Sequence, residues 1–234
     1  MNEGHLKPPS LYYTSHPGNG PPAVLIHGAS TYALDLPGHG RSEGAGQESI
    51  EAYAADVVAF LDELAIERAV LIGHSMGGAI AQMIALSHPD RVDRLVLLAT
   101  AARLRVAPAI LEGIRTNFEE TVRLISQWAW GPGADPLWVE RGREMMEACG
   151  PQVLYGDFLA CDRFDIRDQV AAIACPTLVL VGSEDRMTPP RFGRWLAEQI
   201  PQGEFALIDG AGHMLALERP QAVVNRVAAF LAQA

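Results

Sequence analysis

One serine between glycines stands where the chain could carry a nucleophile. Residues 73–78 read GHSMGG, so Ser75 lies in a Gly-x-Ser-x-Gly pattern, after the apolar run of residues 69–72 and before a segment of small residues. A buried strand that turns sharply into a helix at such a pattern holds the serine in a strained conformation, with its hydroxyl exposed above the sheet. Gly73 and Gly77 leave room for neighbouring backbone to approach closely. Ser75 is therefore the candidate nucleophile.

A serine hydroxyl needs a base to take its proton and usually a carboxylate to orient that base. His213 lies in the segment DGAGHM, just beyond the apolar run of residues 204–208, and Asp185 lies in GSEDRMTP, just beyond the run of residues 177–181. Ligands of an open parallel sheet bind outside the carboxyl ends of its strands, so residues that each follow a strand can converge. The sequence predicts Ser75, His213 and Asp185 as catalytic, with Glu184 beside Asp185 as a competing acid.

Strands and helices alternate along most of the chain. Runs rich in apolar, β-branched or aromatic residues predict strands at residues 11–15, 24–27, 31–36, 69–72, 95–99, 177–181 and 204–208. Apolar residues at helical spacing predict helices at about 49–64, 77–88, 190–199 and from 220 onward. Strands that are apolar throughout and joined by helices are typical of a parallel sheet covered on both faces. The predicted fold class is therefore α/β, with a mostly parallel central sheet flanked by helices.

Residues 103–169 break this alternation. They contain no apolar strand run, and their helical segments are punctuated by Pro108 and by the stretches GPGADP and CGP. An all-helical insertion is therefore expected between two parts of the core, residues 1–102 and 170–234. If this insertion covers a site, some of its apolar side chains face the pocket, whereas the others form its own small core. The tentative pocket residues are Trp128, Trp130, Trp138 and Met145.

Composition excludes several classes of partner. The chain has 234 residues, of which 49% are hydrophobic and 20% charged, as expected for one globular domain or one domain with an insertion. Its formal net charge of -10 repels phosphate backbones and anionic lipid surfaces, so neither nucleic acid nor a membrane is an expected partner. The first 20 residues lack the apolar segment of a secretion signal, and no apolar run approaches the roughly 18 residues of a spanning helix. A soluble, cytoplasmic protein is expected.

The three cysteines and the remaining motifs predict no prosthetic group. Cys149, Cys161 and Cys175 are odd in number and lack C-x-x-C spacing, which favours buried, reduced thiols over a disulfide framework or a zinc site. No motif for a haem, flavin, nucleotide or metal is present, so no cofactor is expected.

These motifs resemble those of the α/β-hydrolase fold superfamily, and within it those of small bacterial serine esterases and lactonases that carry a helical cap. The resemblance spans almost the whole chain and implies that residues 103–169 are the cap. It also implies an oxyanion hole made of two backbone N–H groups. The segment IHGA resembles the family's strand ending in His-Gly, which places one donor at Ala29, and the residue after the nucleophile, Met76, supplies the other. The segment DLPGHGRS is also similar to the family's, and is expected to be a turn beside the site with Arg41 in structural bonds.

The resemblance implies a carboxylesterase that cleaves a small-molecule ester with an apolar acyl or aryl group, the chain being a monomer or a homodimer. Family members that cleave epoxides or carbon–halogen bonds place Asp at the position of Ser75. Carbon–carbon bond hydrolases of the family typically read Gly-Asn-Ser-Met-Gly, and His74 stands here in place of that Asn. An enol-lactonase or carbon–carbon hydrolase with the same triad remains an alternative, as does a ligand-binding protein with little turnover. The sequence does not identify the natural substrate.

The spacing of two predicted strands raises a problem of length. Only the residues GAS follow the run 24–27 before TYALDL begins, and a parallel pair needs a crossover of a dozen or more residues, usually a helix. Three residues span at most about 10 Å, whereas a strand of five or six residues is roughly 15 to 20 Å long. Either the protein carries a further segment of about 15 to 25 residues near Ser30 and Thr31 that the printed sequence lacks, or the crossover has been deleted. The first is favoured, because deletion would uncover one face of the sheet.

Overall fold

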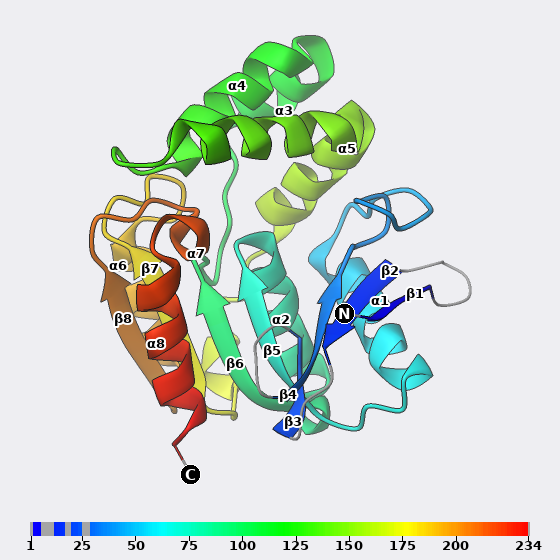
Figure 1. The fold of residues 1–234 in the computed structure, drawn as a ribbon, viewed down its shortest axis with the longest axis vertical. Helices are drawn as coiled ribbons and strands as arrows, with labels where there is room; N and C mark the ends of the chain where they lie inside the picture. The colour runs from blue at the N-terminus through cyan, green and yellow to red at the C-terminus, as the bar shows by residue number, and fades with distance from the viewer. Residues whose placement is uncertain (1, 6–11, 17–19, 25–28, 234) are drawn as a thin grey trace.

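A computed structural model describes residues 2–5, 12–16, 20–24 and 29–233 of the chain. Eight strands of the described residues form one sheet, in the order β1-β2-β4-β3-β5-β6-β7-β8 (Figure 1). The pairs β1–β2 and β2–β4 are antiparallel, and every other neighbouring pair is parallel. The strands are β1 (Asn2–His5), β2 (Tyr12–His16), β3 (Gly20–Val24), β4 (Ala29–Leu34), β5 (Ala69–His74), β6 (Val92–Leu98), β7 (Thr177–Gly182) and β8 (Gly203–Ile208).

Side chains of the central strands alternate between two apolar layers, as the pleat of a strand requires. Leu95 and Leu97 of β6 share one buried layer with the apolar faces of three helices, and Val96 and Leu98 share the opposite layer with two others. The first group is α1 (Ile50–Glu63), α2 (Met76–Ser87) and α6 (Pro190–Gln199), and the second is α7 (Leu215–Glu218) and α8 (Pro220–Leu231). The predicted α/β class, with a mostly parallel sheet flanked by helices, is confirmed.

Local signals explain where these helices begin and end. The side chain of Ser49 accepts the N–H of Ala52 at 3.2 Å and so caps α1, as its position in the sequence predicts. Helix α2 ends two residues before Pro89, and both α6 and α8 begin with a proline, whose missing N–H costs nothing at that position. All four helices lie within a residue or so of the predicted ranges.

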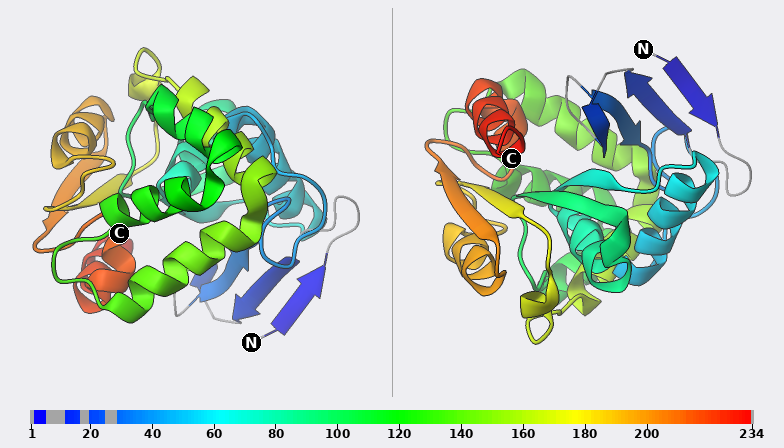
Figure 2. Two further views of the ribbon diagram at one scale, coloured as in Figure 1. Left: turned by 90° about the horizontal axis from the view of Figure 1, so that it is seen from above. Right: turned by 90° about the horizontal axis from the view of Figure 1, so that it is seen from below.

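Three helices form a layer beyond the carboxyl ends of the strands, which we call the helical layer: α3 (Pro108–Thr116), α4 (Phe118–Ala129) and α5 (Pro136–Arg163). Seen from above, they lie across the sheet (Figure 2). They share a small apolar core that includes Ile114 and Val122, and α5 is kinked at Gly150, where φ is +78°. The chain enters and leaves this layer through adjacent segments, because the N–H of Ile166 donates to the carbonyl of Ala102 at 2.9 Å.

Several details differ from the expectations. The polar strand β1 and the single turn α7 were not predicted, because neither has a long apolar pattern. Strands β3 and β4 begin earlier than predicted, and residues 25–28, which include most of the predicted strand 24–27, lie outside the described residues. The cysteines are free, but they are half-buried rather than buried. No helix within the described ranges is long and apolar enough to cross a membrane.

Candidate active site

Ser75 occupies the turn between β5 and α2 in a backbone conformation that side chains rarely adopt. Its φ and ψ angles are 51° and -116°, and its N–H donates to the carbonyl of Leu98 at 2.9 Å. A Cβ atom at Gly73 would lie 2.2 Å from the carbonyl oxygen of Gly77, so only glycine fits there. The hydroxyl of Thr100 donates to the carbonyl of Ser75 at 2.9 Å and holds the turn from the side of β6. Ser75 therefore has the strained conformation that the motif predicts.

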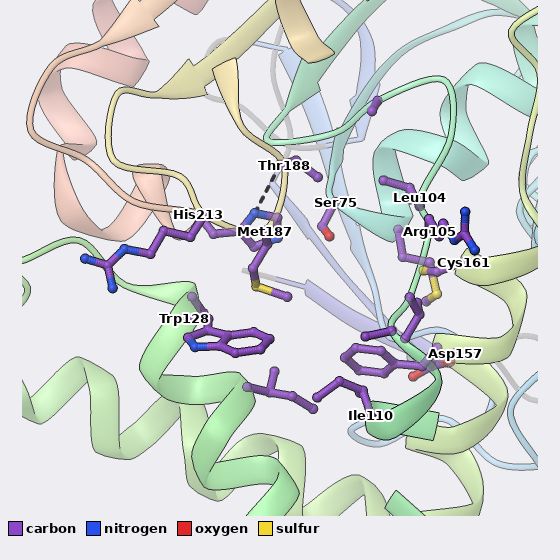
Figure 3. A pocket seen from close by; sticks show the side chains of 18 of the residues that line it. Ser75, Leu104, Arg105, Ile110, Trp128, Asp157, Cys161, Met187, Thr188 and His213 are labelled. Carbon is purple, nitrogen blue, oxygen red and sulfur yellow. Dashed lines mark hydrogen bonds between the residues drawn. The ribbon is translucent and has the colours of Figure 1, made fainter. Parts of the chain in front are cut away.

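His213 and Asp185 come from two loops at the same end of the sheet. His213 lies between β8 and α7, and Asp185 lies between β7 and α6. The Nδ1 atom of His213 is 3.0 Å from Oδ2 of Asp185, and both side chains are buried. With Nδ1 donating to the carboxylate, Nε2 is left as the proton acceptor. Ser75 and His213 line one cavity (Figure 3), so the structure brings together the three residues that the sequence selects.

The carboxylate of Asp185 is surrounded by donors. Its Oδ1 atom accepts the N–H groups of Met187 and Thr188 at 2.9 and 2.8 Å, and its Oδ2 atom accepts the hydroxyl of Thr188 at 2.8 Å. Burial opposes ionisation, yet the bonds from His213 and Thr188 hold the pKa of Asp185 below its ordinary value. Thr188 was not predicted. The signal for it is the spacing Asp-x-x-Thr, which allows a side chain to bond the backbone of its own turn.

A second histidine, His74, lies against His213. The two rings are 4.8 Å apart between centroids, and the Nε2–H of His74 donates to the backbone carbonyl of His213 at 2.9 Å. Burial and the neighbouring His213 lower the pKa of His74 to about 4, so its ring is neutral near pH 7. In the sequence, His74 differs from the Asn of the carbon–carbon bond hydrolases, but no pattern there predicts its contact with His213.

The cavity above Ser75 has a volume of about 710 Å³ and is lined on one side by the helical layer. Trp128 and Ile110 lie across the cavity from Ser75 (Figure 3). Other apolar side chains of the layer that line it are Ile125, Trp130, Met146, Leu154 and Phe158. A pocket of this size and apolar lining suits a medium-sized apolar ligand.

Two of the four tentative pocket residues do not line this cavity. Trp128 and Trp130 line it as expected, whereas Trp138 and Met145 of α5 are exposed and are not among its lining residues. Successive residues of a helix point about 100° apart, so Met146 faces the cavity while its neighbour Met145 faces solvent. The composition of the segment could not reveal this difference, because it depends on how α5 is rotated.

The two backbone donors expected for an oxyanion hole are placed differently. Met76 is the first residue of α2, so its N–H has no acceptor within the helix, and it lines the cavity beside Ser75. Ala29 is the first residue of β4 and is aligned with Gly20. Ala23 of β3 is aligned with Val70, the second residue of β5, and Gly20 precedes Ala23. Ala29, which is aligned with Gly20, therefore lies near the amino ends of the parallel strands, whereas Ser75 follows the carboxyl end of β5. The structure therefore does not bring Ala29 to Ser75, and His27 and Gly28 of the IHGA segment lie outside the described residues.

A polar cluster that the sequence did not predict joins α5 to the core. The buried carboxylate of Asp157 accepts the Nε2–H of His39 at 2.8 Å and the hydroxyl of Tyr53 at 2.5 Å. Burial disfavours the charged form of His39, but the bond to Asp157 outweighs it and raises the pKa of His39. His39 belongs to the DLPGHGRS segment, in which Arg41 pairs with Glu3 at 3.1 Å, the kind of structural bond expected there.

No group of three or more His, Cys, Asp or Glu side chains in the described part of the chain could hold a metal ion.

Comparison with known proteins identifies the family of the chain and similar solved structures. Residues 15–226 match a family model described as "Alpha/beta hydrolase family". The chain is 30% identical over 205 residues to 3-oxoadipate enol-lactonase 2 of Acinetobacter baylyi, covering 84% of this chain and 76% of that protein. It is 32% identical over 250 residues to a pimeloyl-[acyl-carrier protein] methyl ester esterase of Chromobacterium violaceum, covering 92% and 95%.

A solved thermophilic esterase matches the fold with a TM-score of 0.87 and 31% identity, covering 98% of this chain and 96% of that one. The match to the Chromobacterium violaceum protein extends over more positions than the 234 residues of this chain, so that relative contains residues with no counterpart here.

Proposed function

This chain belongs to the alpha/beta hydrolase family, and on that premise we propose that it is a carboxylesterase acting on small to medium apolar esters. The observation that carries the proposal is that Ser75 and His213 line one cavity while Asp185 is bonded to His213. Ser75 is held at a strained turn, His213 lines the same cavity, and Asp185 holds His213 by a bond of 3.0 Å. This constellation is recognised by geometry and roles rather than by position in the chain.

The proposed reaction proceeds through an acyl-enzyme. The Oγ atom of Ser75 attacks the ester carbonyl while Nε2 of His213 takes its proton, and His213 then gives that proton to the leaving alcohol. Water, activated by the same imidazole, releases the acid from Ser75. Asp185 keeps its charge throughout, orients the imidazole and stabilises the imidazolium that forms in each step. Its buried, fully hydrogen-bonded carboxylate is suited to that role.

The N–H of Met76 is the proposed donor to the oxyanion, because it is free at the start of α2 and adjacent to the nucleophile. Ala29 remains the second predicted donor, although it would have to lie at the other end of the sheet from its place in this structure.

Residues 103–169 are the proposed cap, which gates the substrate and excludes water from the reaction. The support is that its side chains, among them Trp128, Trp130 and Phe158, line the cavity that Ser75 also lines. Most of the lining is apolar, which favours an apolar acyl or aryl group, and Arg103, Arg105, Arg167 and Arg186 also line the cavity.

Turnover of a p-nitrophenyl ester series of increasing acyl length tests this proposal. Wild type should hydrolyse the series with an optimum at a medium chain, and Ser75→Ala should fall to near background. A residual of about 10³ to 10⁴ over water is what binding and oxyanion stabilisation leave in a triad enzyme. Ser87→Ala, at the exposed end of α2, is the matched control and should keep full activity. Retention of more than a few per cent of turnover by Ser75→Ala would contradict the assignment.

A lactonase is the second candidate, since the similarity to 3-oxoadipate enol-lactonase 2 favours it and a lactone is an internal ester that the same triad can open. Comparison of kcat/KM for a lactone and a linear ester of equal size separates the two. A ligand-binding role remains if wild type turns over neither class.

A further inference from the structure

The loop between β8 and α7 carries His213 and must place the imidazole of His213 beside Ser75. Most hydrogen bonds of this loop run to other elements than the turn that carries Ser75. The carbonyl of Ala211 accepts the N–H of Glu184 at 2.8 Å, Gly212 donates to Glu218 at 3.0 Å, and Met214 donates to Ala129 at 3.2 Å. These bonds fasten the loop to the acid-bearing loop, to α7 and to α4. None of them fixes its distance from the nucleophile.

Among the hydrogen bonds of the described residues, a single one joins this loop to the β5–α2 turn. It runs from Nε2 of His74, the residue before the nucleophile, to the backbone carbonyl of His213 at 2.9 Å. The imidazole of His74 also packs on that of His213, with 4.8 Å between ring centroids and 58° between the planes. His74 therefore contacts the base through its backbone and through its ring.

We propose that His74 is a positioning residue, which sets the distance between Ser75 Oγ and His213 Nε2 by holding the His213 backbone. This role rests on the proposed function of the triad. A nucleophile and its base must meet within hydrogen-bond reach, and a misplacement of 1 Å can cost about 10²-fold in rate. Because His74 and Ser75 are consecutive, any motion of the turn carries the anchor of His213 with it. The two reacting side chains thus keep their spacing.

Histidine meets three requirements at this position. Its ring is flat enough to pack on His213, its Nε2–H reaches the carbonyl, and it is uncharged at neutral pH. A cation here would oppose the imidazolium that forms on His213 during the reaction. Glutamine keeps an amide donor at nearly the reach of Nε2, whereas phenylalanine keeps a flat ring without a donor.

Steady-state kinetics of His74→Phe and His74→Gln with one p-nitrophenyl ester test the proposal. His74→Phe should lower kcat by about ten- to a hundredfold and change KM by less than about twofold, because the base is misplaced while the binding cavity is unchanged. His74→Gln should recover kcat to within about threefold of wild type. His88→Phe, at the exposed far end of α2, is the matched control and should behave as wild type.

A kcat of His74→Phe within threefold of wild type would overturn the proposal, as would His74→Gln impaired to the same extent as His74→Phe. Should His74→Phe fail to fold, His74→Asn replaces it, because its shorter amide keeps polarity without the reach to the carbonyl. Absence of ester turnover in wild type would instead contradict the proposed function. The positioning role is then read from the downfield NMR resonance of the His213 Nδ1 proton, which should persist in wild type and His74→Gln and shift in His74→Phe; an unshifted resonance overturns it.

Discussion

Adjacent acids in the loop after β7 have opposite environments, and environment decides which of them can orient the base. Asp185 is buried and accepts bonds from Met187, Thr188 and His213, whereas the neighbouring Glu184 is exposed. A carboxylate held from several sides loses little freedom when it fixes an imidazole. An exposed one moves with solvent and holds nothing in place.

Asp185→Asn should therefore lower turnover by several powers of ten, as removal of the orienting carboxylate does in other triads, while Glu184→Gln should stay within about twofold of wild type. The amide keeps the size of the carboxylate, and it loses the negative charge that selects the productive tautomer of His213. The measurement is kcat for one ester at neutral pH, with thermal unfolding as a check of folding. Equal and mild losses in both variants would show that the acid lies elsewhere.

The sequence predicts the three residues of the proposed triad better than the residues that hold them in place. Ser75, Asp185 and His213 each follow a strand in the order expected, so their convergence is a consequence of parallel topology. Thr188 and His74 could not be selected in the same way. Each acts through a hydrogen bond whose partner is decided by loop conformation, which apolar periodicity does not encode.

Among the elements, α5 is tied to the core by a titratable contact. Asp157 on α5 accepts bonds from His39 in the β4–α1 loop and from Tyr53 on α1. The charges that face His39 include Asp157 and the more distant Asp35, and the first of these accounts for its raised pKa once burial is overcome. A pKa that is higher in the folded than in the unfolded state stabilises the fold at low pH, and that stabilisation is lost as pH rises through the folded value.

Urea unfolding at about pH 6, 7 and 8 should show this loss. The free energy of unfolding of wild type should exceed that of His39→Gln by about 1 kcal/mol at the lowest pH, and this difference should shrink toward zero at the highest. Glutamine keeps a donor for Asp157 and removes the titration, so it isolates the charge. A difference that is constant with pH, or that grows as pH rises, would contradict the assigned direction.

The rotation of the helices in the proposed cap decides which of their aromatic residues line the cavity. Trp128 and Trp130 line the cavity, and Trp138 lies on the outside of α5. Sequence composition predicts that residues 103–169 are helical and rich in aromatic residues, and the faces of these helices then separate lining residues from exposed ones. Which face of a helix lines the cavity depends on how α3, α4 and α5 pack on one another, and the sequence of a single helix does not specify that packing.

Trp128→Ala and Trp130→Ala should change the ranking of acyl lengths in the p-nitrophenyl series, because each removes a wall of the cavity and enlarges the space for an acyl chain. The optimum should move toward longer chains, with the triad intact. Trp138→Ala provides the matched control and should leave the ranking as in wild type. An unchanged ranking in both lining variants would reassign these tryptophans to the core of the cap.

For the whole molecule, the faces of the sheet are covered unequally. Helices α1, α2 and α6, which join β4 to β5, β5 to β6 and β7 to β8, lie on one face, as right-handed crossovers require. The step from β3 to β4 runs in the opposite direction along the sheet, so a right-handed crossover there would place its helix on the face of α8. In the described part of the chain, Figure 1 shows α8 over the strands β6 to β8 on that side and no helix over β3 and β4.

The protein itself is therefore expected to carry a crossover helix that the printed sequence lacks. Four residues separate β3 from β4, too few for a helix, and the Chromobacterium violaceum relative has residues without a counterpart here. Such a segment would also restore the oxyanion hole. If β3 ran on to Ala29 in the register that pairs Ala23 with Val70, Ala29 would be level with Met76. It would then lie beside the nucleophile rather than at the far end of the sheet.

Intact mass spectrometry of the protein purified from its natural source distinguishes a crossover segment that the printed sequence lacks from a crossover that has been deleted. A mass of 25.2 kDa would show that the crossover has been deleted, and the exposed face and the displaced Ala29 would then be features of the working molecule. A mass greater by about 2 kDa, as about 20 residues of crossover would add, is the expected result. Peptide mapping should then locate the additional residues between Gly28 and Tyr32, because an insertion elsewhere would leave β3 and β4 without their connection.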